Sequence, residues 1–383
     1  RQAWLDADTG ESVTFEAFRT RVDRLAAGLI AAGIRAGDRL GIIGKNSLPF
    51  FTLYGAAAAT GAVVVPINWR LSESEMAFNL NDCAPRMVFA DPEFASVIDT
   101  LRGKLPSVER FFNLTASGPL DDYNALLADD APGGHSGAAD GAGLVIIHTA
   151  AVAGRPRGAL LSHANVLCSS LHLSDCFGLT PADVHLNLLP LFHVAGLFMA
   201  ISAFHSGALN VNMGKFEATR AVQLIESKKA SVMFDFSPIL GAILDEQKNT
   251  GADISSLRAV MGLDAPDVIE RYQTVTGGRF YSMYGQTETS CLVSLGRYDD
   301  RPGAAGRPIA LVMGGFHLLS ASTTDIARIV RDFRRLGVKK VAPSHCSGDA
   351  ARNQFREAYG PNFIEGGAGL VLSFKRAKPA PSR

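Results

Sequence analysis

A loop that combines glycine with fixed positive charge, within residues 144–158, carries the strongest chemical signal in this chain. The apolar run Leu144–Ile147 predicts a buried strand, and a helical pattern begins near His163. Between them, Arg155 and Arg157 flank a proline. Backbone N–H groups of such a loop hold phosphate oxygens at the start of a helix, and arginine adds charge. The Lys-Ser/Thr ending of a Walker P-loop is absent, so an ordinary turn remains an equal alternative.

A second motif, Tyr-Gly-Gln-Thr-Glu-Thr at residues 284–289, places a hydroxyl and a carboxylate side by side. It follows the short apolar segment Phe280–Met283, and we expect a glycine turn at the end of that strand. Mg²⁺ binds to one or two carboxylates together with phosphate oxygens, so Glu288 alone would suffice. The alternative interpretation is a polar turn without a ligand.

Two further segments have chemical potential as well as ordinary structural interpretations. His193 is the polar residue of the otherwise apolar segment Leu189–Gly196, where it is either a satisfied core residue or a gate to an apolar pocket. Gly262–Pro266 follows a strand and opens a helix. An ordinary βα turn with Asp264 near the N-cap explains that segment equally well.

The elements that must position these residues alternate between strands and helices. Apolar residues repeat at helical spacing from Phe15 to Leu29, after Thr14 as a cap and before Gly33 as a stop. Short apolar strands separate the helical stretches, which predicts an α/β architecture with largely parallel sheets. The predicted strands are Leu40–Ile43, Ala62–Val65, Met87–Ala90, Leu144–Ile147, Ala208–Val211, Ala230–Met233 and Ala259–Met261.

The sequence changes character near residue 300, where a turn-rich stretch precedes a smaller α/β unit. We expect a strand at Ala310–Met313, an amphipathic helix through Ile326 and Phe333 that ends at Gly337, and a strand at Val338–Val341. These patterns predict a large domain over residues 1–308 and a C-terminal piece over residues 309–383.

Composition excludes several classes of function. Lys+Arg and Asp+Glu both number 37 in 383 residues, so no basic surface for nucleic acid is expected. Five scattered cysteines favour a reducing cytoplasm. The charge-free runs at residues 47–69 and 184–214 are too polar or too interrupted for a transmembrane segment. The chain begins at Arg1 rather than Met, so we expect a short segment to precede it. The oligomeric state is not readable from these patterns.

Taken together and in order, the four segments resemble the motifs of the adenylate-forming superfamily, which includes acyl-CoA synthetases, peptide-synthetase adenylation domains and luciferases. The family's phosphate loop, roughly Thr-Ser-Gly-Thr-Thr-Gly-x-Pro-Lys-Gly and then Thr-His, is similar to Thr149–Gly158 followed by Ser162-His163. Its Tyr-Gly-x-Thr-Glu motif matches Tyr284–Glu288. The resemblance covers residues 1–308 and includes the segments Thr14-Phe15, Gly37-Asp38, Asn46, Pro66–Asn68, Arg70 and Gly303–Pro308.

The resemblance implies a two-step reaction that uses ATP, Mg²⁺ and coenzyme A. A small organic or fatty acid attacks the α-phosphorus of ATP, and the thiol of coenzyme A then takes the acyl group. Thr287 would contact the α-phosphate, Glu288 would hold Mg²⁺, and His193 would border the acyl site; these three are the implied catalytic residues. The implied nucleotide-binding residues are Thr149, Gly154, Arg157, Gly158, Gly262, Ala265, Pro266, Tyr284, Gly285 and Thr287.

The chain departs from the family pattern in two places. Residues 150–153 are Ala, Ala, Val and Ala where the family has Ser, Gly, Thr and Thr, so three hydroxyl donors are lost. Each lost hydrogen bond to a charged partner costs about 1.5–3 kcal/mol. After Pro308, the family's ribose-binding Asp, hinge and catalytic Lys have no counterpart. We therefore expect the ligase activity of this chain to be weak or absent.

Residues 310–372 resemble instead the C-terminal end of a metallo-β-lactamase-fold protein. The matching segments are Met313–Leu318 and Pro343–Gly348, and His345 would be a terminal metal ligand. The main metal motif of that fold, His-x-His-x-Asp-His, is absent, which favours an ordinary loop histidine. The alternatives to a ligase are therefore a non-catalytic nucleotide- or acyl-binding remnant or fusion product and, less favoured, a metal-dependent hydrolase.

Overall fold

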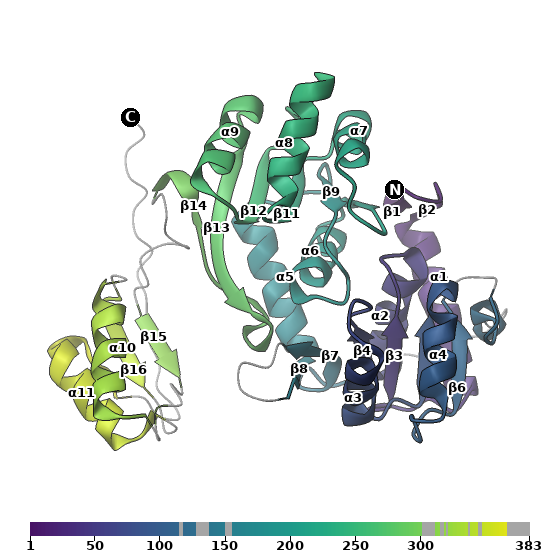
Figure 1. The fold of residues 1–383 in the computed structure, drawn as a ribbon, viewed down its shortest axis with the longest axis horizontal. Helices are drawn as coiled ribbons and strands as arrows, with labels where there is room; N and C mark the ends of the chain where they lie inside the picture. Colours follow the sequence, from purple (N-terminus) through teal and green to yellow (C-terminus); the bar gives the residue numbers. More distant parts are fainter. Residues whose placement is uncertain are drawn as a thin grey trace. The chain divides into compact units, whose positions relative to one another are not determined.

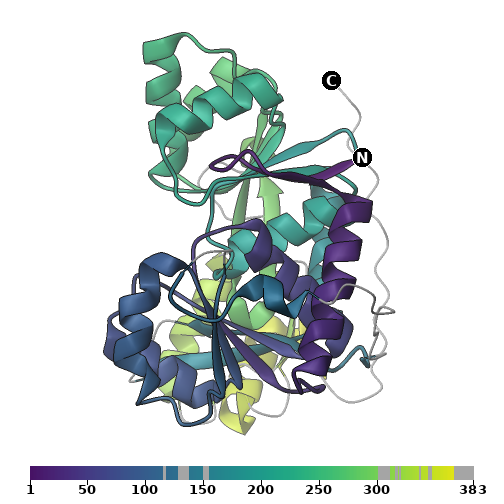
Figure 2. The ribbon, with the colours of Figure 1, turned by 90° about the vertical axis from the view of Figure 1, so that its right-hand side faces the viewer.

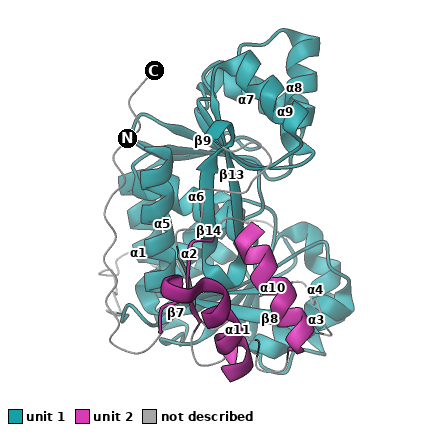
Figure 3. Cartoon of the chain, turned by 90° about the vertical axis from the view of Figure 1, so that its left-hand side faces the viewer, with its two compact units in different colours: residues 1–306 teal, residues 307–383 magenta. Residues whose placement is uncertain are grey.

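The computed structural model divides the chain into two compact units, Arg1–Gly306 and Arg307–Arg383 (Figure 3). It describes residues 1–114, 118–127, 138–149, 155–300, 318, 321–335, 338–343 and 347–365, together with the backbone of residues 311–314. Each unit is considered by itself.

Within unit 1, one sheet has eight strands in the order β14-β13-β12-β11-β9-β10-β1-β2. Neighbouring strands in this sheet are parallel, except for the antiparallel pairs β13–β14 and β1–β2 at its two edges. The strands are β1 Gln2–Asp6, β2 Ser12–Thr14, β9 Val184–Asn187, β10 Leu209–Asn212, β11 Val232–Phe236, β12 Ala259–Leu263, β13 Arg279–Gln286 and β14 Cys291–Arg297.

The second sheet of unit 1 has six strands in the order β6-β5-β3-β4-β7-β8. All its neighbours are parallel except β7 and β8, which form an antiparallel pair. The strands are β3 Arg39–Ile43, β4 Val63–Ile67, β5 Met87–Ala90, β6 Arg110–Asn113, β7 Gly143–Thr149 and β8 Arg157–Ser162.

Helices cover both faces of the two sheets. Apolar side chains of α7, α8 and α9 pack on one face of the eight-stranded sheet, and those of α1, α2, α5 and α6 fill the core shared by both sheets (Figure 1). Figure 2 shows α3 and α4 (blue) on one flank of the six-stranded sheet and α1 (purple) on the other. The α-helices are α1 Phe15–Ala31, α2 Leu48–Thr60, α3 Glu73–Cys83, α4 Ala95–Arg102, α5 His163–Phe177, α6 Val194–His205, α7 Ala218–Lys228, α8 Ile239–Thr250 and α9 Pro266–Thr276. Short 3₁₀ helices are η1 Pro92–Phe94, η2 Tyr123–Leu126, η3 Thr287–Thr289 and η4 Tyr298–Asp300.

Local sequence signals explain where these helices begin and which faces they bury. The hydroxyl of Thr14 accepts a hydrogen bond from the backbone of Ala17 at 3.1 Å and caps α1, and Phe18, Leu25 and Leu29 are buried. This confirms the predicted helix. Seven predicted strands are also confirmed, as β3, β4, β5, β7, β10, β11 and β12.

Two local predictions were wrong. The helix predicted near His163 is confirmed as α5, but the loop after β7 does not lead into it directly, because β8 intervenes and pairs with β7 as a hairpin, with Thr149 opposite Arg157. Gly285 is likewise not a turn: it lies within β13, opposite Leu292 of β14, and the chain turns only after Gln286.

Unit 2 contains a small parallel sheet with helices. β15 Leu311–Gly314 pairs with β16 Lys340–Pro343, and the helices are α10 Thr323–Arg335, α11 Asp349–Tyr359 and the 3₁₀ helix η6 Gly360–Asn362. Its core includes Ile326, Val341 and Phe355. In the part of the chain that the structure describes, no helix is long and apolar enough to cross a membrane.

Candidate active site

The site lies where the end of a strand from the six-stranded sheet meets the end of a strand from the eight-stranded sheet. Thr149 is the last residue of β7 in the six-stranded sheet, and Glu288 lies in η3, just after β13 of the eight-stranded sheet. The Thr149 hydroxyl donates a hydrogen bond to Oε1 of Glu288 at 3.0 Å. Two motifs separated by 139 positions in the sequence therefore touch directly.

The turn that carries Glu288 depends on a close backbone approach. A Cβ atom on Gly285 would lie 1.6 Å from the carbonyl oxygen of Cys291, so only glycine lets β13 and β14 come together there. The Thr289 hydroxyl donates to the Gln286 carbonyl at 3.0 Å and accepts from the Gln286 amide at 3.3 Å. These bonds hold η3 and keep the carboxylate at the strand end.

A cavity of about 820 Å³ opens beside this contact. Thr149, His193, Gly285, Thr287 and Glu288 line it, so the structure brings five of the predicted site residues together. Thr287 is 6% exposed. The other lining residues are Pro66, Asn68, Leu71, Glu75, Asn79, Ile147, His148, Pro156, Phe192, Val194, Ala195, Phe234, Phe236, Met283, Gln286 and Cys291.

His193 stands at the N-terminus of α6, where it has a structural as well as a chemical role. Its Nδ1 accepts a hydrogen bond from the backbone N–H of Ala195 at 3.3 Å, so Nε2 carries the proton in the neutral ring. The ring packs edge-on to Phe236, with centroids 6.3 Å apart. Burial lowers the pKa of His193. The neutral ring therefore offers an N–H donor on Nε2.

Two substitutions at His193 separate its capping role from its cavity role. Asparagine preserves a side-chain acceptor for the start of α6, whereas alanine removes it. We expect His193→Ala to lower the free energy of unfolding by about 1 kcal/mol relative to His193→Asn, measured by urea unfolding. Equal stabilities of the two variants would show that the cap contributes nothing.

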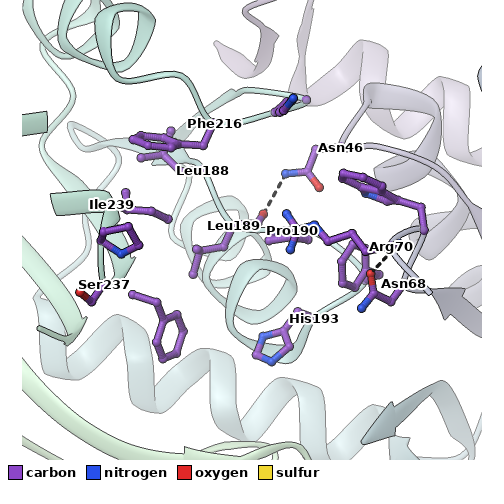
Figure 4. Close-up of a pocket in the computed structure, with 16 residues that line it drawn as sticks. Asn46, Asn68, Arg70, Leu188, Leu189, Pro190, His193, Phe216, Ser237 and Ile239 are labelled. Carbon is purple, nitrogen blue, oxygen red and sulfur yellow. Dashed lines mark hydrogen bonds between the residues drawn. The ribbon is translucent and has the colours of Figure 1, made fainter. Parts of the chain in front are cut away.

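A second cavity, of about 350 Å³, shares Asn68, Phe192, His193 and Phe236 with the first. Figure 4 shows its residues, with Asn46 beside the carbonyl of Leu189. Asn46 donates to that carbonyl at 2.8 Å and accepts from the Leu191 amide at 2.7 Å, which fixes the segment leading to His193.

Four of the implied nucleotide-binding residues do not line either cavity, namely Gly262, Ala265, Pro266 and Tyr284. Gly262 sits in β12, where a Cβ would lie 1.9 Å from the Asp235 carbonyl oxygen of β11. Ala265 is the N-cap of α9 and Pro266 is its first residue. Tyr284 is 53% exposed on β13.

The remaining predicted nucleotide-binding residues are distributed around the β7–β8 hairpin. Arg157 and Gly158 lie at the start of β8, opposite Thr149 and His148. Gly154 and the altered positions 150–153 lie outside the described residues, as does His345.

Asp235 is a fully buried carboxyl at the end of β11. Its Oδ1 accepts a hydrogen bond from the Leu240 amide at 3.0 Å. Burial, and after it the charge of Asp264, raise the pKa of Asp235 to about 8. The folded protein therefore keeps this carboxyl protonated at neutral pH.

The raised pKa of Asp235 predicts how stability changes with pH. The unfolded chain loses this proton near its ordinary pKa of about 4, whereas the folded chain keeps it until about 8. The free energy of unfolding should therefore fall as pH rises between these values. Asp235→Asn cannot ionise, so we expect it to flatten this slope and to gain about 2–4 kcal/mol over the parent near pH 8. An unchanged slope in urea unfolding across this range would contradict the assignment.

Several residues of the larger cavity were not among the predicted site residues. Glu75 and Asn79 come from α3, and His148 immediately precedes Thr149 on β7. The alternation of strand side chains does not reveal that His148 faces α3. Glu75 and Asn79 are four positions apart and therefore share a helix face. That spacing is the sequence pattern that could have pointed to them.

A family model identifies the class of protein to which this fold and site belong. The family model for AMP-binding enzymes matches residues 1–313, and the chain belongs to this family. That finding, together with the largely parallel sheets flanked by helices, confirms the predicted fold of the large domain.

Several named relatives are CoA ligases. The chain is 31% identical to an indoleacetate–CoA ligase of Aromatoleum aromaticum over 75% of this chain and 58% of that protein. It is 30% identical to a feruloyl-CoA synthase of Amycolatopsis sp over 78% of this chain and 60% of the relative. The chain thus spans just under two thirds of the length of these relatives.

Solved structures agree with the sequence relatives. A protein described as a long-chain-fatty-acid CoA ligase from Rhodopseudomonas palustris superposes with a TM-score of 0.75 at 39% identity, over 80% of this chain and 77% of that one. The N-terminal domain of FACL13 from Mycobacterium tuberculosis gives a TM-score of 0.73 at 26% identity, over 80% of this chain and 78% of that one.

Proposed function

We propose that this chain binds ATP and an organic acid and forms an acyl-adenylate. The acid's carboxylate oxygen bonds to the α-phosphorus of ATP as the bond to pyrophosphate breaks. The thiol of coenzyme A then displaces AMP to give a thioester. The observation that carries the proposal is the hydrogen bond from Thr149 to Glu288 inside the shared cavity, with His193 on the same cavity wall.

The residues around Glu288 fit a Mg²⁺–nucleotide complex. Mg²⁺ prefers a few carboxylate oxygens together with phosphate oxygens, and Glu288 offers one carboxylate at the cavity wall. When bound, Mg²⁺ would neutralise charge that develops on the phosphoryl oxygens. Thr287 and Thr149 supply hydroxyls next to that carboxylate, and Arg157 supplies a positive charge at the start of β8.

The apolar part of the cavity supports an apolar acid as substrate. Phe234 and Phe236 come from β11, Met283 comes from β13, and Val194 and Ala195 begin α6. The Nε2 proton of His193 lies at the polar border of this wall. Relatives that act on fatty and aromatic acids are consistent with such a lining.

We also propose that adenylation by this chain is slow. The alanines and valine at residues 150–153 remove hydroxyl donors from the phosphate loop, so ATP should bind less tightly than in relatives with serine and threonine. We place the end of the ligase-like region near residue 308. The division into compact units at residues 306 and 307 supports this boundary. The likeness of residues 310–372 to a metallo-β-lactamase end, with His345 as a ligand, stays a prediction for metal analysis of the purified protein.

We further propose a cytoplasmic location. The described cysteines Cys83, Cys168, Cys176 and Cys291 form no disulfide with one another. Cysteines that form no disulfide with one another are typical of proteins in a reducing compartment.

Acid-dependent exchange of labelled pyrophosphate into ATP tests the proposed activity. Fatty, indole and hydroxycinnamic acids would be assayed with Mg²⁺, and ATP binding would be measured by calorimetry in parallel. We expect slow exchange with at least one apolar acid. Binding without exchange would support the alternative of a non-catalytic nucleotide-binding remnant. If the chain shows no exchange and also binds no ATP, the proposal is wrong.

A further inference from the structure

Three side chains of different chemistry converge where the C-terminal end of α3 meets β7. Nε2 of His148 lies 3.3 Å from Oδ2 of Asp82 and 3.9 Å from Sγ of Cys83. All three ligand atoms lie within 4.8 Å of one another. His148 lines the same cavity as Thr287 and Glu288, but the proposed adenylation assigns no role to the cluster.

The two separations from Nε2 of His148 are close to those of ligands around one tetrahedral metal ion. Zinc bonds of about 2.0–2.1 Å to nitrogen, 2.0–2.2 Å to oxygen and 2.3 Å to sulfur place N and O about 3.3 Å apart and N and S about 3.6 Å apart. The observed N···O distance of 3.3 Å agrees closely with the expected value. The observed N···S distance of 3.9 Å is a few tenths of an ångström longer than expected.

The same geometry argues against a Cys-His-Asp catalytic relay. A relay uses both ring nitrogens of histidine, one toward the nucleophile and one toward the carboxylate. Here Nε2 of His148 faces both Cys83 and Asp82, whereas Nδ1 has no hydrogen-bond partner among the described residues. A metal ion bound by all three residues requires Nε2 of His148 to lie near both Cys83 and Asp82, as it does here.

Two buried polar atoms near the cluster have no hydrogen-bond partner among the described residues. The side chain of His148 is only 5% exposed, and its buried Nδ1 is unpaired within the described part of the chain. Oδ1 of Asn79, one turn before Cys83 on α3, is also buried without a hydrogen-bond partner there. Unpaired buried polar atoms are costly, and ligand sites are where proteins retain them.

The chemistry of the three ligands selects the class of metal. Burial lowers the pKa of His148, which favours the neutral ring that a metal ion can bind once its Nε2 proton has moved to Nδ1. Burial raises the pKa of the Cys83 thiol to about 12, so a metal must displace that proton to bind sulfur. Ions with high affinity for thiolate and imidazole do this, whereas Mg²⁺ and Ca²⁺ prefer oxygen ligands.

We propose that Asp82, Cys83 and His148 form a binding site for Zn²⁺ or a similar thiophilic divalent ion, with water as the fourth ligand. Such an ion joins the end of α3 to β7 one residue before Thr149. It thereby stabilises the strand end that leads into the phosphate loop. The site does not depend on the adenylation activity.

Titration of the purified protein with Co²⁺ tests the proposal, because tetrahedral thiolate ligation gives a sulfur-to-cobalt charge-transfer band and intense visible bands. We expect both bands in the parent, their displacement by Zn²⁺, and a higher Tm with Zn²⁺. Cys83→Ser should lose the charge-transfer band. Asp82→Asn, a change at a half-exposed side chain, should weaken Co²⁺ binding at least tenfold while leaving the fold intact.

Cys168→Ser is the matched control, since Cys168 is an exposed thiol on α5. It should retain the parent spectrum and affinity. Absence of the charge-transfer band in the parent, or its persistence in Cys83→Ser, would overturn the proposal. A loss of the band in Cys83→Ser together with unchanged affinity in Asp82→Asn would also overturn the three-ligand site.

Discussion

Replacing Glu288 by glutamine is expected to reduce acid-dependent ATP–pyrophosphate exchange by about 10²–10³-fold, the cost typical of losing one electrostatic contact in a transition state. Glutamine preserves the size of the side chain and an oxygen that accepts the hydrogen bond from Thr149. It removes the negative charge that would hold Mg²⁺ at the cavity wall. The exchange rate should therefore fall while the Tm stays near that of the parent.

Glu270→Gln provides the matched control for this substitution. Glu270 is exposed on α9 and does not line the cavity. Its substitution removes the same charge from the protein but should leave exchange unchanged. If Glu288→Gln exchanged pyrophosphate as fast as this control, the assignment of Glu288 as the metal-binding carboxylate would be wrong.

Gly285→Ala is expected to be the most destabilising single-methyl change at the site. The added Cβ would meet the Cys291 carbonyl oxygen at 1.6 Å, which forces β13 and β14 apart. Overpacking typically costs about 1–3 kcal/mol, and a backbone clash of this size belongs at or beyond the upper end. We expect a loss of about 3 kcal/mol or more in urea unfolding. Exchange should also be lost, because η3 follows directly.

Gly103→Ala is the comparison for this prediction. A Cβ on Gly103 has no atom within 4 Å, and its φ of −72° suits any L-residue. The alanine should therefore be neutral or slightly stabilising. A Gly285→Ala variant as stable as Gly103→Ala would show that the β13–β14 pairing does not need glycine.

Periodicity and capping predicted much of the fold, because the signals are local. Thr14 and the apolar face through Phe18 and Leu29 defined α1, and short apolar runs marked the parallel strands. The hairpin β7–β8 was missed because Arg157–Ser162 is mostly exposed and mixed in character. Pairing with β7, which is a tertiary interaction, makes that segment a strand.

The site was predicted in part for the same physical reason. The Tyr-Gly-Gln-Thr-Glu motif and the loop motif each have a local pattern, and the structure adds the direct contact between Thr149 and Glu288. His148 and Cys83 lie 65 positions apart in the sequence, and only the packing of α3 on the six-stranded sheet brings them together. No local pattern contains that information.

Calorimetric binding of a non-hydrolysable acyl-sulfamoyl-adenosine tests most directly whether one cavity holds both the nucleotide and the acid. This compound joins an apolar acyl group to adenosine in the arrangement of the proposed acyl-adenylate. We predict that it binds one site per chain at least tenfold more tightly than AMP or the free acid, and that an alanine at Phe236 weakens it. Binding no tighter than that of AMP alone would contradict a shared site for the acid and the nucleotide.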